Sequence, residues 1–287
     1  MQETPRIGPV ALCTLIAADG QAATDAYTRF MHQQVVAASE LDADTAGALG
    51  YPQLAGNRHW ILANQQGRQW LQILEYPEAS TRDSLASFGW LALEVLVEDV
   101  DQLASSLTSS PFELLRPPAD LDVSDKIRAC QVRGPAGEIL YLTQVSGEVP
   151  PFELPTCSAP VDHLFIPVLS TPSRERSLTQ YASISATTGL TFETKITVVN
   201  QARGFDLEQR HPVATLQLAG QALLEIDEIA HTLEAPAGIN SGMACVALHC
   251  SATADSTAYT AQQGPFSGHQ VSSHRGCAGE HFTLVYS

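Results

Sequence analysis

The apolar positions along the chain fall into short runs that predict four similar units. Each unit opens with a mostly apolar strand, continues into a helix, and ends with further strands. The spacing between successive openings is about 80, 73 and 80 residues. A repeat of this period indicates that each unit is one supersecondary element that needs a neighbour to bury its apolar face. The openings lie near Val10, Trp90, His163 and Met243.

The clearest unit begins at residue 88. A run of Leu and Val over 88–97 predicts a buried strand. Asp99 follows at the position where a side chain caps a helix, and apolar residues at helical spacing over 100–107 predict that helix. Gly-Pro-Ala-Gly at 134–137 predicts a turn, and the apolar run 138–143 predicts a strand after it.

The same patterns predict the other elements. Hairpins are expected over Gln66-Gly67 and Gly220-Gln221, where turn residues separate two apolar runs. Helices are expected over 22–38, 171–188 and 252–262, and strands over 161–169, 192–199, 242–250 and 279–285.

A proline-rich segment near the middle of the chain predicts a domain boundary. Residues 146–160 contain four prolines, which helix and sheet interiors exclude. We therefore expect an N-terminal domain over 1–146, a linker over 147–160 and a C-terminal domain over 161–287. Each domain is expected to wrap two units around a pocket, which makes the fold class α+β.

Composition excludes several classes of partner. The 287 residues carry 31 acidic and 15 basic side chains, for a formal charge of −16, so a concentrated basic surface for nucleic acid or an anionic membrane is not expected. The sequence has no run of eighteen apolar residues and no basic, apolar leader at its start. Six irregularly spaced cysteines predict free thiols in a reducing compartment. A cytoplasmic protein is the expectation.

Four of these stretches resemble the vicinal oxygen chelate superfamily, which includes glyoxalase I, bleomycin-resistance proteins and extradiol dioxygenases. The resemblance implies four βαβββ units paired into two cupped mixed-sheet domains. It is specific for fold and much less so for activity, because one fold hosts many functions. The stretches are Trp-Leu-Ala-Leu-Glu-Val at 90–95, Gly-Pro-Ala-Gly-Glu at 134–138, Val-Asp-His-Leu at 161–164 and Leu-Leu-Glu-Ile at 223–226.

The resemblance also implies where a metal would be held. In metal-dependent members, one ligand near the start of each unit's first strand and one on its last strand converge in the cup. These positions fall on Leu12, Gln72, Trp90 and Tyr141 in the first half, and on His163, Glu225, Cys245 and Thr283 in the second. The first set lacks suitable ligands, so its cup is expected to be metal-free. The protein is expected to hold either no cofactor or one divalent ion at His163 and Glu225.

Three side chains of the second half are candidates for catalysis. His163 is a candidate general base, with Glu225 setting its tautomer. The alternative is a buried hydrogen bond that ties two strands together. Cys245 is the third candidate, and the alternative for it is a small buried apolar residue. His249 shares a strand face with Cys245 and is expected near the same pocket.

The first cup is expected to offer flat apolar walls to a ligand, with a filled core as the alternative. Glu94 has the parity of Trp90 and is expected to face inward, which favours an open pocket because a buried carboxylate is costly. The residues expected to bind substrate are Trp90, Tyr141, Gln72, His249 and Thr283.

Three functions remain open from the sequence. The first is an enzyme acting on a small organic molecule, aromatic ones included, by proton-transfer, lyase or ring-opening chemistry in the C-terminal cup. The second is a non-catalytic binder without metal, similar to drug-sequestering members of the superfamily. The third is a scaffold with degenerate cups. The expected partner is a small-molecule ligand, and the resemblance also permits a homodimer.

Overall fold

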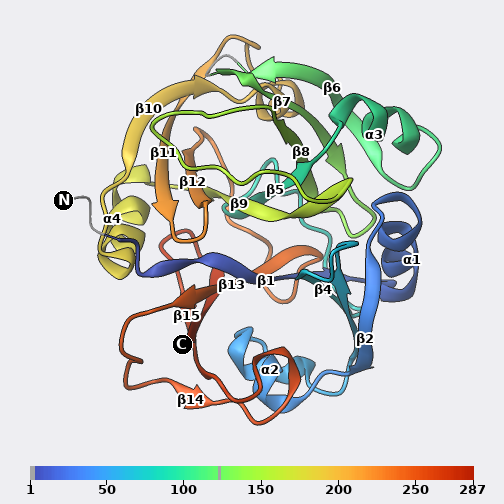
Figure 1. Ribbon diagram of the computed structural model, residues 1–287, viewed down its shortest axis with the longest axis vertical. Coiled ribbons are helices and arrows are strands. Elements are labelled where there is room, and N and C mark those ends of the chain that lie inside the picture. Colours follow the sequence, from blue (N-terminus) through green and yellow to red (C-terminus); the bar gives the residue numbers. More distant parts are fainter. Residues whose placement is uncertain (1–3, 122–123) are drawn as a thin grey trace.

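The computed structural model describes residues 4–121 and 124–287, and it contains two eight-stranded mixed sheets. Figure 1 shows the two sheets one above the other. The strand that opens each unit lies at the centre of its sheet, and the four predicted units are confirmed. The opening strands are β1 (Ile7–Ala17), β5 (Gly89–Val97), β9 (Val161–Thr171) and β13 (Gly242–Cys250).

The first and fourth units build one sheet, which we call the terminal sheet. Its strand order is β14-β15-β16-β13-β1-β4-β3-β2, and β1 and β13 pair antiparallel with Cys13 opposite Val246. The other strands are β2 (Gln34–Glu40), β3 (Arg58–Ala63), β4 (Gln69–Glu75), β14 (Tyr259–Thr260), β15 (Gln270–Arg275) and β16 (His281–Tyr286).

The second and third units build the central sheet, in the order β10-β11-β12-β9-β5-β8-β7-β6. Its middle strands β5 and β9 pair antiparallel and are buried along their whole length. Strands covered on both faces have apolar residues throughout, which explains the long Leu and Val run that opens the second unit. The other strands are β6 (Glu113–Leu121), β7 (Ser124–Arg133), β8 (Ile139–Val145), β10 (Leu190–Lys195), β11 (Arg210–Leu218) and β12 (Ala222–Glu228).

The units therefore pair differently from the expected division into residues 1–146 and 161–287. Each sheet takes one unit from each half of the chain. The proline-rich segment 147–160 joins β8 to β9 inside the central sheet and does not separate two sheets. The repeat pattern is the same for either pairing, so it carries no information about which opening strands meet.

The chain passes between the two sheets twice. The crossings are residues 76–88, after β4, and residues 229–241, after β12. Isolated bridges between Ser80 and Asn240 and between Ser87 and Leu233 hold these two segments side by side. The crossings are thus the true connections between the two cupped sheets.

Helices follow the opening strands of the first three units: α1 (Gly20–Phe30), α3 (Val100–Leu107) and α4 (Arg174–Ser185). The predicted cap is confirmed, because the Asp99 side chain accepts from the Gln102 amide. Asp19 and Ser173 cap the other two helices in the same way.

For three predicted elements, the predicted boundary or the predicted type of secondary structure was wrong. The helix expected over 22–38 ends at Phe30, and β2 takes up its last residues. The strand expected over 192–199 stops at Lys195, and α5 (Thr197–Arg203) follows. Residues 252–262 contain no helix, and there the Asp255 carboxylate accepts from the Thr257 amide. Such local hydrogen bonds stabilise turns at the expense of helix.

A repeated six-residue motif links the two sheets. Arg-Gly-Pro-Ala-Gly-Glu at 133–138 and Arg-Gly-Cys-Ala-Gly-Glu at 275–280 each end in a buried glutamate. Tyr27 of α1 donates to Glu138 at 2.7 Å, and Tyr181 of α4 donates to Glu280 at 2.9 Å. In both cases a helix of one sheet's unit is bound to a turn of the other sheet. These contacts lie at the large apolar core that the two sheets share.

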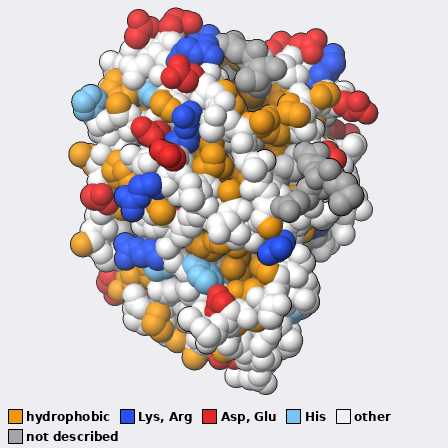
Figure 2. All heavy atoms as spheres, turned by 90° about the vertical axis from the view of Figure 1, so that its left-hand side faces the viewer, with side chains coloured by type: hydrophobic (Ala, Val, Ile, Leu, Met, Phe, Trp, Pro, Cys, Tyr) orange, Lys and Arg blue, Asp and Glu red, His pale blue; other side chains and the backbone are white. Residues whose placement is uncertain are grey.

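The surface agrees with the acidic composition. On the face shown in Figure 2, Lys and Arg side chains are dispersed among acidic and neutral groups and do not form one basic region. Nucleic-acid binding requires such a region. Within the described ranges, no helix combines the length and the apolar character needed to cross a membrane.

Candidate functional site

The face of the central sheet that points away from the shared core borders a cavity of about 530 Å³, which we call the central cavity. Strands β5, β8, β9 and β12 contribute to its lining, together with β6, β7, β10 and β11. The proline-rich segment supplies residues 149–152 and 154, so it helps to form this site. The apolar part of the lining includes Val149, Phe152, Leu154, Phe165, Ile166, Phe192, Ile196 and Leu223.

Two glutamates face this cavity from strands on either side of β9. Glu94 on β5 lies opposite Ile166 of β9, and Glu225 on β12 lies opposite Val168 of β9. Their strands are separated by one strand and their partners on β9 are two residues apart, so their backbones are roughly 12 Å apart. Both residues line the central cavity, as does Tyr141, which lies opposite Glu94 on β8.

Burial shifts both carboxyls toward the protonated form. It raises the pKa of Glu94 to about 8, and the charge of Glu225 adds to this effect. Burial also raises the pKa of Glu225 to about 7. Within the described ranges, no positively charged group is a cause of either shift. At neutral pH the pair therefore carries both a proton to give and a lone pair to receive one.

Two further polar side chains accompany this pair. Burial raises the pKa of Asp227 well above its usual range, and the charges of Glu225 and Glu94 raise it further. Both carboxyl oxygens of Asp227 and the hydroxyl of Tyr141 are buried without a hydrogen-bond partner among the described residues. Unpartnered buried polar groups are costly, and they are often retained at sites that bind a ligand.

The donor set does not fit a resident divalent metal. Protein sites for such ions typically use three or more side chains. No three His, Cys, Asp or Glu side chains in the described parts of the chain are arranged to hold one ion. The central cavity offers Glu94 and Glu225, and the neighbouring positions on β8 and β9 carry Tyr141 and Ile166.

The corresponding face of the terminal sheet is filled. Figure 1 shows α2 (Ala43–Ala48) inside the curve of this sheet. Thr283 donates to the carbonyl of Ala48 at 2.5 Å, and its hydroxyl lies 3.4 Å from the Cys245 sulfur. Gln72 accepts from Thr14 at 2.8 Å. Leu12 packs in the same cup, in an apolar cluster with Ala48.

The structure thus redistributes the positions that the superfamily resemblance singled out. Gln72, Cys245 and Thr283 gather in the terminal cup with Leu12, although they were assigned to different halves. Tyr141 and Glu225 gather in the central cavity. Burial raises the pKa of Cys245 to about 12, so its thiol is protonated at neutral pH.

His163 and Glu225 do not form the expected pair. His163 lies five residues along β9 from Val168, the neighbour of Glu225, which is roughly 16 Å along a strand. Its Nδ1 is 2.8 Å from Asp162, which also accepts from Asn64 at 2.6 Å. Burial alone would raise the pKa of Asp162, but hydrogen bonds from His163 and Ser158 outweigh it and lower that pKa to about 2. His163 is thus part of a buried polar cluster between the two sheets.

Trp90 also lies outside the central cavity, although Glu94 faces it. The register of β5 against β9 shifts between Trp90 and Ala92, which reverses the alternation of side chains. Trp90 therefore enters the shared core and donates to the carbonyl of His281 at 2.8 Å. The inward direction predicted for Glu94 is correct, but the parity argument that grouped it with Trp90 is wrong.

His249 lies four residues from Cys245 on β13, roughly 13 Å along the strand. Burial lowers its pKa, and the charges of His269 and Arg68 add to this effect. Because of this separation along β13, His249 lies near the end of the strand and not beside Cys245.

Asp227 is the acidic neighbour that sequence reasoning missed. Leu-Glu-Ile-Asp at 224–227 places two carboxyls two residues apart in a strand, and such residues share a face. That spacing was available from the sequence. The sequence did not reveal that Glu225 and Asp227 lie near Glu94, because this proximity depends on the pairing of the second unit with the third.

Solved structures with the same fold include enzymes. Glyoxalase I from Zea mays superposes with a TM-score of 0.61 at 13% identity, covering 98% of this chain and 93% of that one. A Bacillus subtilis protein proposed to be a dioxygenase gives 0.64 at 10% identity, covering 99% and 86%. The cppA protein from Streptococcus pneumoniae TIGR4 gives 0.51 at 10% identity, covering 99% of both chains. At these identities the likeness establishes the fold.

The sequence itself matches no family model, and it matches no curated protein. The fold predicted from the resemblance, with glyoxalase-like units paired into two cupped sheets, is confirmed.

Proposed function

Because the chain has the paired-unit fold seen in glyoxalase I, we propose that its central cavity binds a small, largely apolar carbonyl compound and catalyses proton transfer on it. The observation that carries this proposal is the pair Glu94 and Glu225. A buried carboxyl and a half-buried one face a predominantly apolar cavity, and loss of solvation is the main cause that raises their pKa values to about 8 and about 7. General acids and bases work best when their pKa is near the ambient pH.

The two carboxyls take complementary roles. Glu225, with the lower pKa, is the base and accepts a proton from a carbon next to the substrate carbonyl. Glu94, with the higher pKa, is the acid and donates its proton to the carbonyl oxygen, which gives a neutral enol. When Glu225 returns its proton to carbon, Glu94 recovers the hydroxyl proton of the enol, and both groups are regenerated. The net result is an exchange, racemisation or isomerisation.

The remaining lining would orient the substrate. The Tyr141 hydroxyl has no partner among the described residues and is available to bind a substrate oxygen. Burial holds the pKa of Tyr141 well above its usual range, so this hydroxyl stays a donor. Apolar side chains such as Phe165, Phe192 and Leu223 suit an aromatic or aliphatic body.

A non-catalytic binder is the second candidate, and the predominantly apolar lining favours it. Such a protein would hold the same ligands without moving a proton. In either case the partner is a small molecule. The homodimer and the cytoplasmic location stay predictions from the sequence.

Proton exchange distinguishes these two functions. We would incubate the full chain with phenylacetone in D₂O near neutral pD and follow the loss of its benzylic proton signal by NMR. The expected result is exchange above the buffer rate, reduced about 100-fold in Glu225→Gln, because general-base catalysis is typically worth 10²–10⁴-fold. The matched control is Glu148→Gln, which changes an exposed glutamate.

The outcome against catalysis is equally definite. If phenylacetone and the bulkier ketone 2-indanone both bind, as measured by saturation-transfer NMR, but neither exchanges faster than in buffer, the protein is a binder. If Glu225→Gln and Glu148→Gln exchange equally fast, the assignment of Glu225 as the base is wrong.

A further inference from the structure

A second pocket lies where the two sheets meet, and it is built differently from the central cavity. Its volume is about 250 Å³, and we call it the junction pocket. Residues from both crossing segments line it, together with the starts of β5 and β13 and the turn between β15 and β16. The side chains that matter here are Tyr51, Arg82, Trp90, Met243, Arg275 and His281.

Arg82 is a buried cation without a carboxylate partner. Its side chain donates through Nε to Ser87 at 2.9 Å and through Nη2 to the carbonyl of Phe88 at 2.9 Å. Only 7% of the residue is exposed, and no carboxylate among the described residues lies within ion-pair distance. Burial lowers its pKa to about 10, although Tyr51 and Asp83 partly offset this effect. Buried guanidinium groups are normally paired with an anion.

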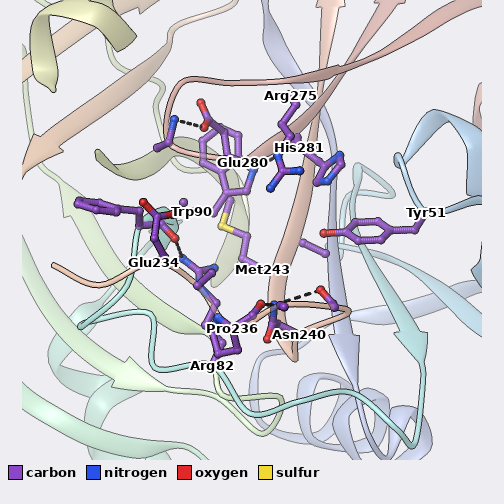
Figure 3. Close-up of a pocket in the computed structure, with 18 residues that line it drawn as sticks. Tyr51, Arg82, Trp90, Glu234, Pro236, Asn240, Met243, Arg275, Glu280 and His281 are labelled. Carbon is purple, nitrogen blue, oxygen red and sulfur yellow. Dashed lines mark hydrogen bonds between the residues drawn. The ribbon is translucent and has the colours of Figure 1, made fainter. Parts of the chain in front are cut away.

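Further donors face the same space. Figure 3 shows Arg275 and His281 on one side of the pocket, Arg82 on another, and the Tyr51 hydroxyl pointing between them. Burial raises the pKa of Tyr51 to about 12 even though both arginines act to lower it, so the hydroxyl remains a donor. The ring of His281 lies 4.7 Å from that of Tyr51, which fixes both.

The acidic residues of the pocket make no hydrogen bond to Arg82, whose partners are Ser87 and the carbonyl of Phe88. The charge of Arg275 acts on Glu280 and lowers its pKa against the effect of burial. Glu280 accepts from the Tyr181 hydroxyl and from the Ala278 amide at 2.9 Å each, so its carboxyl is already bound. Glu234 is exposed to solvent at the rim. The cationic end of the pocket is therefore open to an anion from outside.

We propose that the junction pocket binds the carboxylate of a small molecule, with Arg82 and Arg275 holding the carboxylate and Trp90 and Met243 contacting an apolar body. Guanidinium groups match the planar geometry of a carboxylate and can donate two parallel hydrogen bonds to it. The apolar wall favours an organic acid over inorganic phosphate, which has no apolar part. This binding site is separate from the two glutamates of the central cavity.

Calorimetric titration of the full chain at low salt tests this proposal. The probes are benzoate, its neutral analogue benzamide, and inorganic phosphate. We expect saturable binding of benzoate, no binding of benzamide, and binding of benzoate about tenfold weaker in Arg275→Gln, in line with one charge-assisted hydrogen bond. Arg133→Gln is the matched control, since Arg133 opens the other copy of the six-residue motif and is paired with Glu113.

Each other outcome overturns the proposal. Equal binding of benzoate and benzamide would show that the carboxylate is not recognised, and equal effects of Arg275→Gln and Arg133→Gln would place binding elsewhere. Phosphate binding that depends on Arg275, without benzoate binding, would make this a site for inorganic anions only. Arg275 is exposed, so its loss is not expected to unfold the chain, and a thermal melt checks this. Glu225→Gln is expected to leave benzoate binding unchanged, which separates this result from the proposed proton transfer.

Discussion

The charge of Glu225 raises the pKa of Glu94 across the intervening strand β9. Two carboxyls that start with the same ordinary pKa are thereby separated into one that tends to hold its proton and one that tends to lose it. Burial is the largest cause of both shifts, and the charge of Glu225 raises the pKa of Glu94 further. This relationship exists only because the second and third units share a sheet.

Removal of the charge of Glu225 is therefore expected to lower the pKa of Glu94. In Glu225→Gln the pKa of Glu94 falls below about 8, by roughly 1 unit, which is the scale of interaction between coupled groups. The measurement is a pH titration of carboxyl carbons by ¹³C NMR. An unchanged Glu94 titration in Glu225→Gln would show that the two carboxyls do not interact.

The same carboxyls make stability depend on pH. Their pKa values are raised in the folded state, so between about 4.5 and about 8 the folded chain holds protons that the unfolded chain has lost. The stability that these protons confer is complete below the unfolded pKa and is lost as the pH rises through the folded pKa. The contribution of these two carboxyls to the free energy of unfolding should consequently decrease from pH 5 to pH 8.

Glu94→Gln isolates this effect. Its neutral amide cannot ionise, so the decrease in unfolding free energy between pH 5 and pH 8 should be smaller than in the parent, by on the order of 2 kcal/mol. Urea unfolding at the two pH values measures it. Parallel pH dependences in the variant and the parent would mean that Glu94 is not protonated in the folded protein.

The link between Tyr27 and Glu138 is expected to stabilise the contact between the two sheets. Burial raises the pKa of Glu138 to about 7, and the Tyr27 hydroxyl and the Ala136 amide are its hydrogen-bond donors. Tyr27→Phe leaves a buried carboxyl with one donor fewer, which should cost about 1–3 kcal/mol of unfolding free energy. Tyr76→Phe is the control in urea unfolding, because Tyr76 is only half-buried and its hydroxyl makes no hydrogen bond to the described residues. Equal effects of both variants would argue against the link.

The cysteines should differ in reactivity according to burial. Cys245 is fully buried, and burial raises its pKa to about 12, whereas Cys277 is partly exposed. Thiolates, not thiols, react with iodoacetamide, so Cys277 should be alkylated at pH 8 well before Cys245 in the native chain. Peptide mass spectrometry over a time course provides the rates. Rapid alkylation of Cys245 in the native chain would show that the terminal cup opens to solvent.

The sequence predicted more of the fold than of the site. The four units and the cap at Asp99 follow from local patterns, because apolar periodicity and capping depend on neighbouring residues. The inward direction of Glu94 was predicted correctly, but from an alternation that is interrupted between Trp90 and Ala92. The helix expected over 252–262 failed where side-chain hydrogen bonds to the local backbone favour a turn. The placement of Trp90 failed at an irregularity in β5 that apolar periodicity does not reveal.

Local patterns along the chain are enough to show that it is built from four strand-rich units with buried opening strands. Which units share a sheet is fixed by long-range contacts, because the opening strands are all apolar and their patterns fit either pairing. That choice separated His163 from Glu225, brought Glu94 and Glu225 to one cavity, and left the other cup filled by α2. The proximity of Glu94 and Glu225 depends on contacts between residues more than a hundred positions apart in the sequence, and local patterns do not predict such contacts.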